Sequence, residues 1–228
     1  MGVFEWIKNC LYKQLQNLLL AFIIIALLLF IPAGTLNYWN AWIFICILFV
    51  PMFIVGIILM IKSPDLLRKR LNSKEKESEQ GILLMVCGVM FICGFVVSGL
   101  NYRFEWIILP KMIVFIATSI FLFGYLLYAE VLRENMYLSR IIEIEENQKV
   151  IDTGLYSIIR HPMYLSTILL FLSIPLVLGS LFSFLIFLIY PVIIARRIRN
   201  EEQVLEEGLK GYSEYKKKVK YRVIPFIW

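Results

Sequence analysis

Two short polar segments in the last third of the chain hold residues whose types and spacing suit chemistry. In the first, Arg160 and His161 are followed by Pro162, Met163 and Tyr164. Proline is favoured in the first turn of a helix, so Pro162 predicts a helix start with His161 at its cap. The free N–H groups of a helix start favour anions, and Arg160 and His161 add positive or donor groups. We therefore expect this corner to accept a carboxylate, such as that of an amino-acid-like cofactor.

The second segment opens the C-terminal tail at residue 196. One face of the helix predicted there is apolar except for a single acid; its members are Ile194, Ile198, Glu201, Leu205, Leu209 and Tyr212. Arg197 lies one turn before Glu201, and that pair alone would stabilise a helix by roughly a few tenths of a kcal/mol. A carboxylate that faces inward at a membrane surface is costly unless it has a cationic partner. A sulfonium ion would be such a partner, and a ribose hydroxyl or an amine would serve equally.

Taken one at a time, the aromatic residues of these segments have simpler explanations. His161 is the chain's only histidine, and alone it is more typical of a helix cap at a membrane interface. Tyr156 and Tyr164 alone are typical of interface anchors. Residues 148–156 predict an extended piece that ends in a turn at Thr153–Gly154. The combination and order of the segments, rather than any one residue, indicate chemistry.

The elements that must position these residues are membrane helices. Asp, Glu, Lys and Arg are absent from residues 14–61, 81–102, 112–129 and 162–195. A helical crossing needs about 20 apolar residues. The stretches predict an all-α bundle of six crossings at Leu15–Ala33, Trp39–Ile61, Ile82–Leu100, Met112–Val131, Met163–Leu178 and Leu181–Ala195. The last two are short and should form a hairpin with a turn at Gly179–Ser180. Either of them could be a buried or re-entrant helix, so five crossings remain an alternative.

Orientation is predicted from the basic residues. They gather before the first crossing, in the loop from Lys62 to Lys76, in the loop before the fifth crossing, and in the tail. The first loop is uncharged, and the third has only Arg103 and Lys111 as basic residues. Basic loops favour the cytoplasm. Both termini, the candidate site and an amphipathic C-terminal helix are therefore expected on the cytoplasmic side.

Composition excludes several other classes of protein. Hydrophobic residues make up 60% of the chain, more than is typical of a soluble domain. The net charge of +6 is explained by a basic fringe beside anionic membrane lipids, so no nucleic-acid partner is expected. The cysteines form no CxxC pair and predict ordinary buried thiols rather than a metal site; they are Cys10, Cys46, Cys87 and Cys93.

The order of the motifs resembles the isoprenylcysteine carboxyl methyltransferase family, within the larger group that includes phospholipid N-methyltransferases. The resemblance covers residues 147–228; the first 130 residues match only in being membrane helices. It rests on the turn at Gly154–Tyr156, the Arg160–Tyr164 motif, the apolar hairpin, Glu201–Glu202 with Leu205, the pair Tyr212 and Tyr215, and a basic run that ends at Ile224–Pro225. The resemblance implies an S-adenosylmethionine pocket with cytosolic access. Charge density divides the chain into transmembrane helices at 1–131 and a more polar region at 132–228, and the resemblance implies that the second region binds the cofactor.

Carried over by position, the resemblance implies specific site residues. The cofactor would be bound by Gln148, Lys149, Val150, Ile151, Tyr156, His161, Pro162, Met163, Tyr164 and Glu201. Arg197 would bind the substrate, and no catalytic residue is assigned. Eukaryotic members have histidine in place of Gln148, and a small residue usually stands where this chain has Leu165 and Ser166. Because of these departures, the resemblance does not decide whether the substrate is a prenylcysteine.

The chemistry of methyl transfer indicates which kind of acceptor group this protein could methylate. A carboxylate is already ionised at pH 7 and needs no general base, and positioning alone can lower its barrier by several kcal/mol. With one histidine, placed at the cofactor, base catalysis is poorly provided, although Glu202 or a tyrosine could serve. We therefore expect a lipophilic carboxylate or thiol as acceptor, with a phospholipid amine as the alternative. A sterol-reductase-like enzyme is a further alternative, but the sequence has no Gly-rich phosphate loop for NADPH.

Overall fold

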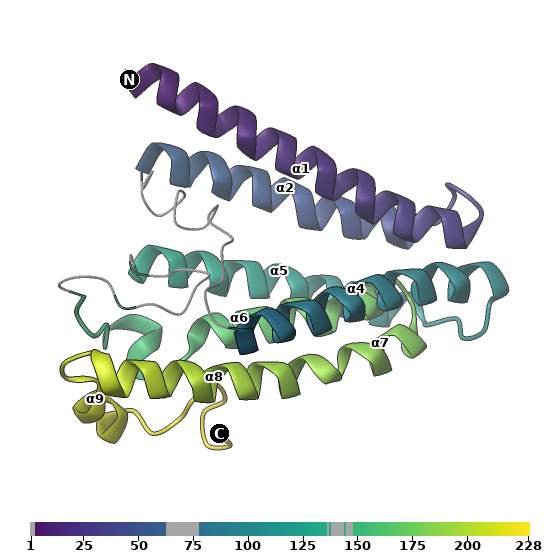
Figure 1. Cartoon of the computed structure of the whole chain (residues 1–228). Coiled ribbons are helices and arrows are strands. Elements are labelled where there is room, and N and C mark those ends of the chain that lie inside the picture. Colours follow the sequence, from purple (N-terminus) through teal and green to yellow (C-terminus); the bar gives the residue numbers. More distant parts are fainter. Residues whose placement is uncertain (1–2, 63–77, 136, 138–143, 145–147) are drawn as a thin grey trace.

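Helices make up most of the protein in the computed structural model, which describes residues 3–62, 78–135, 137, 144 and 148–228 (Figure 1). The elements are α1 (Val3–Ala33), α2 (Trp39–Lys62), α4 (Ser78–Phe104), α5 (Lys111–Glu134), the 3-10 turn η1 (Gly154–Ser157), α6 (Pro162–Val177), α7 (Leu181–Phe187), α8 (Ile189–Gly208) and α9 (Tyr212–Lys218). No strand occurs in these ranges, and Ile159 and Tyr221 form an isolated bridge. The basic residues between Arg68 and Lys76 lie outside the described part.

Within the described residues, five helices are long and apolar enough to cross a membrane, namely α1, α2, α4, α5 and the combined α7–α8. Their outer faces carry large apolar side chains, such as Leu19 at 61% exposure, Met85 at 70% and Leu126 at 69%. Such exposure on helix after helix is expected where lipid is the solvent. The predicted all-α transmembrane bundle is confirmed, and the protein is a multi-pass membrane protein.

Helix α6 is one of the two short helices for which the sequence did not decide between a full crossing and a buried or re-entrant helix. Its 16 residues span about 24 Å at 1.5 Å per residue, less than the roughly 30 Å core of a bilayer. Its partner in the predicted hairpin follows at once, because Gly179 takes a φ of 75° and the Ser180 hydroxyl accepts a hydrogen bond from the Ser183 N–H. The hairpin prediction is confirmed. Helix α7 gives way to α8 at Leu188, since Pro191 has no N–H to donate to Phe187.

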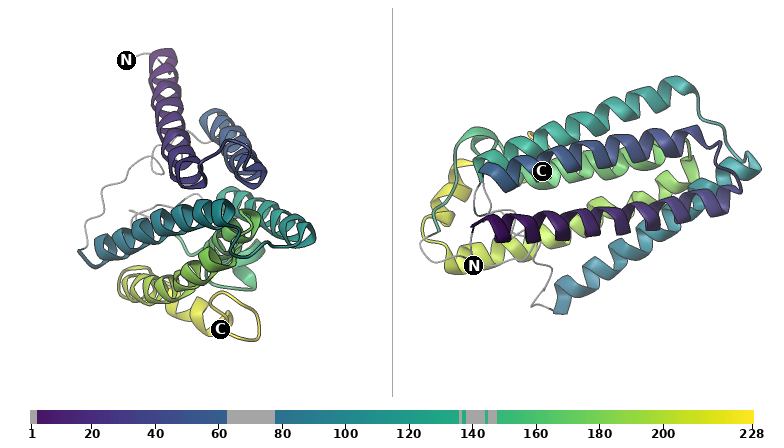
Figure 2. Two further views of the ribbon diagram at one scale, coloured as in Figure 1. Left: turned by 90° about the vertical axis from the view of Figure 1, so that its right-hand side faces the viewer. Right: turned by 90° about the horizontal axis from the view of Figure 1, so that it is seen from above.

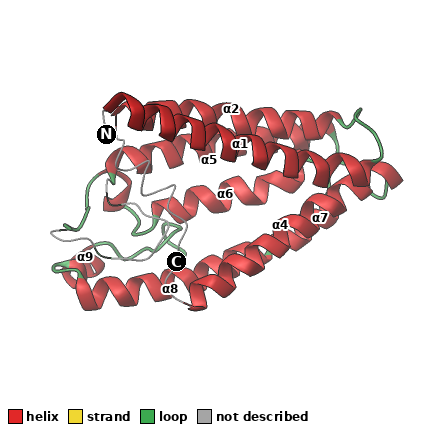
Figure 3. Ribbon diagram, turned by 45° about the horizontal axis from the view of Figure 1, so that its top comes forward, coloured by secondary structure: helices red, strands yellow, loops and turns green. Residues whose placement is uncertain are grey.

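The helices run side by side along one long axis, and the start of α1 lies toward the same end as α9 and the C-terminal segment (Figures 1 and 3). The opposite end is closed by side chains that hold the α6–α7 turn. The Tyr38 hydroxyl donates to the Leu178 carbonyl at 2.6 Å, and the Asn40 amide donates to the Val177 carbonyl at 2.8 Å. Asn101 donates to the Gly179 carbonyl at 3.3 Å. These contacts fix the far end of α6 and therefore the position of its other end.

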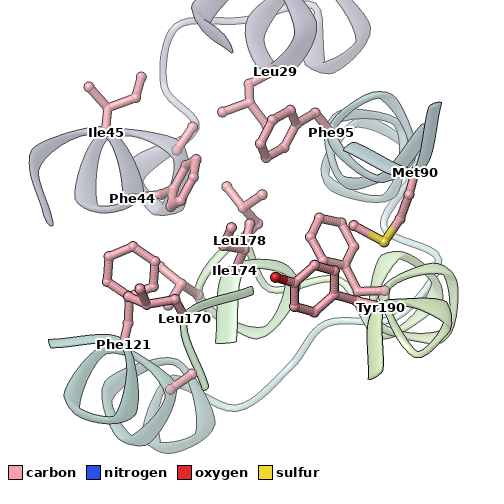
Figure 4. Close-up of a cluster of buried hydrophobic side chains, with 14 of the residues drawn as sticks. Leu29, Phe44, Ile45, Met90, Phe95, Phe121, Leu170, Ile174, Leu178 and Tyr190 are labelled. Atoms are coloured by element: carbon pink, nitrogen blue, oxygen red, sulfur yellow. The ribbon is translucent and has the colours of Figure 1, made fainter. Parts of the chain in front are cut away.

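The core lies where α6 is surrounded by its neighbours (Figure 4). Viewed from the end, α1 and α2 lie on one side of the bundle (Figure 2), and they share its core, since Leu29 of α1 and Phe44 of α2 belong to it. Phe121, Leu170 and Ile174 are buried there. Gly124 brings α5 close to α6, because a Cβ at this position would lie 3.0 Å from Leu170 Cγ. Small residues let membrane helices approach in this way.

The C-terminal part differs from the single stripe predicted through Tyr212. Helix α8 ends at Gly208 and α9 begins at Tyr212, because Gly211 between them adopts a left-handed φ of 91°. Within α8, Ile194 and Ile198 are buried as predicted. An amphipathic C-terminal helix and the division of the chain at residue 132 stay predictions.

Candidate functional site

A pocket opens at the end of the bundle where α5, α6, α8 and α9 meet the segment before α6. Its empty space, open solvent included, is about 860 Å³. It is lined by Asn135, Tyr137, Gln148, Lys149, Val150, Ile151, Tyr156, Arg160, His161, Met163, Tyr164, Arg197, Glu201, Leu205, Leu209, Tyr212 and Tyr215. These residues are separated by up to 80 positions in the sequence, so the fold itself assembles the pocket.

Of the residues expected to bind the cofactor, all but one line this pocket. Pro162 is the exception: it is buried at the first position of α6 and is not among the lining residues. It acts on the pocket indirectly, because it starts α6 directly after its cap residue, His161. Arg197, the expected substrate residue, lines the same pocket as Glu201. The roles of all these residues remain predictions.

Three polar side chains form a chain of hydrogen bonds on the pocket wall. Arg197 Nε donates to the Tyr164 hydroxyl at 3.0 Å, and that hydroxyl donates to Glu201 Oε2 at 2.5 Å. Glu201 keeps 24% of its side chain exposed, whereas Tyr164 is 4% exposed. The tyrosine thereby fixes the orientation of both charged groups, and Glu201 retains access to the pocket.

The second acid of the pair, Glu202, lies behind the pocket in a cluster of cations. Its Oε1 lies 2.7 Å from Arg160 Nε and 3.3 Å from His161 Nε2, and its Oε2 lies 3.0 Å from Arg222 Nε. The side chain of Glu202 is 3% exposed. A buried carboxylate is tolerated when it is paired and hydrogen-bonded in this way. Glu202 therefore holds Arg160 and His161 in place.

The C-terminal segment completes this arrangement by pairing with the residues before α6. The Arg160 N–H donates to the Tyr221 carbonyl at 2.9 Å, and the His161 N–H donates to the Arg222 carbonyl at 2.8 Å. Arg160 Nη1 also donates to the carbonyls of Val219 at 2.7 Å and Lys220 at 2.8 Å. The cap of α6 is thus held from both its backbone and its side chains.

The segment from Gln148 to Ile151, here called the strip, forms another wall without regular secondary structure. Its end is tied to α9 by Asp152, whose Oδ2 lies 3.1 Å from Lys218 Nζ. It is tied to α5 by the hydrogen bond from Thr153 to Glu134. The turn predicted at Thr153–Gly154 is confirmed, since Gly154 has a φ of 53° and begins η1.

Two tyrosines of α9, Tyr212 and Tyr215, line the pocket. The Tyr215 hydroxyl donates to the Tyr156 carbonyl at 2.7 Å, and the Tyr156 hydroxyl accepts from Asn135 Nδ2 at 2.9 Å. The Tyr212 hydroxyl is buried and has no hydrogen-bond partner in the part of the chain that the structure describes. Burial raises the pKa of both Tyr212 and Tyr215 above the ordinary value for tyrosine, so both keep their protons at neutral pH.

The structural role of Glu202 was not predicted from the sequence, which suggested this residue only as a general base. The signal was present in the motifs. Adjacent residues on a helix point about 100° apart, so Glu201 and Glu202 cannot both face one pocket. A buried acid needs a cation, and Arg160 precedes His161 in the first motif. Arg222 could not be found in this way because the tail's fold was not predictable.

No group of three or more His, Cys, Asp or Glu side chains suited to a metal ion occurs among the described residues. Of the charged groups near the pocket, Arg160 and Glu202 form a buried pair.

Comparison with known proteins finds similarity over part of the chain. The sequence model of the isoprenylcysteine carboxyl methyltransferase (ICMT) family matches residues 113–207, from α5 to the last turn of α8. The delta(14)-sterol reductase TM7SF2 of Mus musculus is 30% identical over 84 residues, which are 36% of this chain and 20% of that protein. The chain thus spans about a fifth of that reductase's length. Residues 113–207, which are less than half of the chain, are thus similar to the isoprenylcysteine carboxyl methyltransferase family.

Proposed function

We propose that this protein transfers the methyl group of S-adenosylmethionine to a lipophilic acceptor that carries a carboxylate or a thiol. The observation that carries the proposal is the pocket itself. It brings together the strip, the cap of α6 and Glu201, which are the residues that the family resemblance assigns to the cofactor. Enzymes of this family use S-adenosylmethionine as methyl donor.

The chemistry of the pocket wall suits that donor. S-adenosylmethionine supplies an electrophilic methyl group on a positively charged sulfur. Glu201 offers a partly exposed carboxylate for a positive group, and its orientation is set by the hydrogen bond from Tyr164. The start of α6, with His161 as its cap residue on the pocket wall, favours a carboxylate. The wall therefore provides partners of both signs for an amino-acid-like group.

The acceptor is best matched by an anionic group. Arg197 lines the pocket one turn before Glu201 and could hold a carboxylate beside the donor, since a guanidinium binds a carboxylate through two parallel hydrogen bonds. Glu202 is poorly suited to act as a base, because Arg160, His161 and Arg222 already engage it. A carboxylate needs no base, whereas an amine must lose a proton before it attacks. A phospholipid amine is therefore the second choice.

A reductase activity is the competing proposal, and the similarity to the mouse sterol reductase favours it. NADPH carries several phosphate charges, whereas the cations Arg160 and Arg222 by the pocket are engaged with Glu202. Calorimetric titration of the purified full chain with S-adenosylhomocysteine and with NADPH separates the two proposals. We expect saturable binding of S-adenosylhomocysteine and none of NADPH. The reverse pattern would overturn the methyltransferase proposal.

The site and both termini are proposed to face the cytoplasm. The start of α1, α9 and the C-terminal segment lie toward one end of the bundle (Figure 3). The tail at this end carries the basic residues Lys216, Lys217 and Lys218 in the last turn of α9, and basic segments favour the cytoplasmic side. The cofactor would enter from the cytosol, and a lipophilic acceptor would enter from the membrane.

A further inference from the structure

The hydroxyl of Tyr212 stands out among the polar groups of the pocket. Tyr212 is 4% exposed, and its hydroxyl oxygen is buried without a partner among the described residues. An unpaired polar group inside a protein costs free energy. Tyr215 lies on the same short helix, is 6% exposed, and donates its hydroxyl to the Tyr156 carbonyl at 2.7 Å. The two tyrosines are buried to a similar extent, but among the described residues only the Tyr215 hydroxyl has a hydrogen-bond partner.

The position of Tyr212 follows from the turn between α8 and α9. Gly211 adopts a φ of 91°, which favours glycine, and it lets α9 fold back so that the Tyr212 N–H donates to the Leu209 carbonyl at 3.1 Å. The Tyr212 side chain then packs with Leu209, Tyr215 and Val219. The turn and this packing therefore place the Tyr212 side chain on the pocket wall.

Two kinds of surface meet at Tyr212. Its ring belongs to an apolar cluster that includes Val150 and Leu205, both of which line the pocket. At the same time Tyr212 interacts electrostatically with Glu201, Glu202 and Arg160. Tyr212 thus stands at the boundary between the apolar wall of the pocket and its charged end.

We propose that the Tyr212 hydroxyl binds the methyl donor through a hydrogen bond with a ribose hydroxyl. This inference rests on the proposed function. In S-adenosylmethionine the ribose joins a charged amino-acid part to a flat, largely apolar purine, and the boundary at Tyr212 matches that junction. A ribose hydroxyl both donates and accepts, so it can pair with a phenol. The unpaired oxygen of Tyr212 would gain its partner when the donor binds.

The first test removes each hydroxyl in turn from the full chain in detergent and measures affinity for S-adenosylhomocysteine together with thermal unfolding without ligand. Tyr212→Phe should bind S-adenosylhomocysteine roughly three- to tenfold more weakly than the native chain. Its midpoint of thermal unfolding should equal or exceed that of the native chain, because the change removes a buried hydroxyl without a partner among the described residues. Tyr215→Phe is the matched control and should unfold at a lower temperature, because it breaks the hydrogen bond to Tyr156. Equal affinity of Tyr212→Phe and the native chain would overturn the inference, as would a loss of stability like that of Tyr215→Phe.

The second test locates the contact on the ligand. The 2′-deoxy and 3′-deoxy analogues of S-adenosylhomocysteine are titrated against the native chain and against Tyr212→Phe. One analogue should bind the native chain more weakly and lose no further affinity in the variant, since both changes remove the same hydrogen bond. Additive losses for both analogues would contradict the ribose contact. A native chain that binds no S-adenosylhomocysteine would overturn the proposed function and this inference together, whereas normal binding with no effect of Tyr212→Phe overturns the inference alone.

Discussion

Arg160 and Glu202 form an ion pair with a distance of 2.7 Å between Nε and Oε1, and their side chains are 5% and 3% exposed. The pair joins the residue before the cap of α6 to the middle of α8. His161 and Arg222 contact the same carboxylate. One carboxylate thus connects the start of α6, helix α8 and the C-terminal segment, which are the parts that surround the pocket.

Removal of that carboxylate should destabilise the protein. Glu202→Gln leaves Arg160 buried without a counter-charge, and breaking a buried pair typically costs about 3–5 kcal/mol. Thermal unfolding of the purified protein in detergent should show a clear fall in midpoint. Glu206→Gln is the control, because the Glu206–Lys216 pair is 39% and 32% exposed and such pairs contribute at most about 1 kcal/mol. Equal midpoints for the two variants would contradict a structural role for Glu202.

His161 and Glu201 should each contribute to cofactor affinity. Loss of one charge-assisted hydrogen bond costs about 1.5–3 kcal/mol, so His161→Ala and Glu201→Ala should each bind S-adenosylmethionine at least about tenfold more weakly. Titration calorimetry measures this directly. Glu207→Ala, which changes an exposed acid of the same helix, should bind normally. If both pocket variants keep native affinity, the pocket has been assigned to the wrong ligand.

Arg197 should act on the acceptor more than on the donor. Its Nε contacts the Tyr164 hydroxyl at 3.0 Å, and lysine cannot reproduce the planar guanidinium. Arg197→Lys should therefore lower turnover or acceptor affinity by about tenfold or more, with a smaller change in S-adenosylmethionine affinity. Arg196→Ala and Arg199→Ala on other faces of α8 test for a general lipid contact. Methyl transfer impaired equally in all three variants would show that the arginines anchor the helix.

Topology should follow the charge pattern. Reporter fusions at residue 75 and at the C-terminus should both report the cytoplasm, because basic segments favour that side. If α6 is a full crossing, the chain crosses the membrane six times, and the two fusions must then report the same side. A cytoplasmic signal from one fusion and an external signal from the other would rule out six crossings.

Much of the fold could be predicted because a membrane demands long apolar segments. The crossings at Trp39–Ile61 and Met112–Val131 fall within α2 and α5, and Pro162 gave the start of α6 to the residue. The break between α7 and α8 was missed, although Pro191 marks it. A single missing N–H interrupts a helix without changing the apolar pattern, so hydropathy does not report it.

The candidate site was predictable where a motif is local and not where its partners are distant. Arg197 and Glu201 lie one turn apart, so their common wall follows from helical spacing alone. The contacts of Arg160 with Val219 and Lys220 join residues about 60 positions apart, and no periodicity predicts them. Tyr212 was placed on the stripe of α8, but the left-handed Gly211 turns it back toward the pocket.

The central claim is that this pocket binds a methyl donor for transfer to a lipophilic acceptor. The most direct test incubates the purified protein with methyl-labelled S-adenosylmethionine and a total lipid extract, then identifies the labelled product by mass spectrometry. We expect the label on a lipophilic molecule, as a methyl ester or thioether, and its loss in Glu201→Ala. Label transfer that persists unchanged in Glu201→Ala, or no transfer to any lipid by a native chain that binds NADPH, would contradict the account.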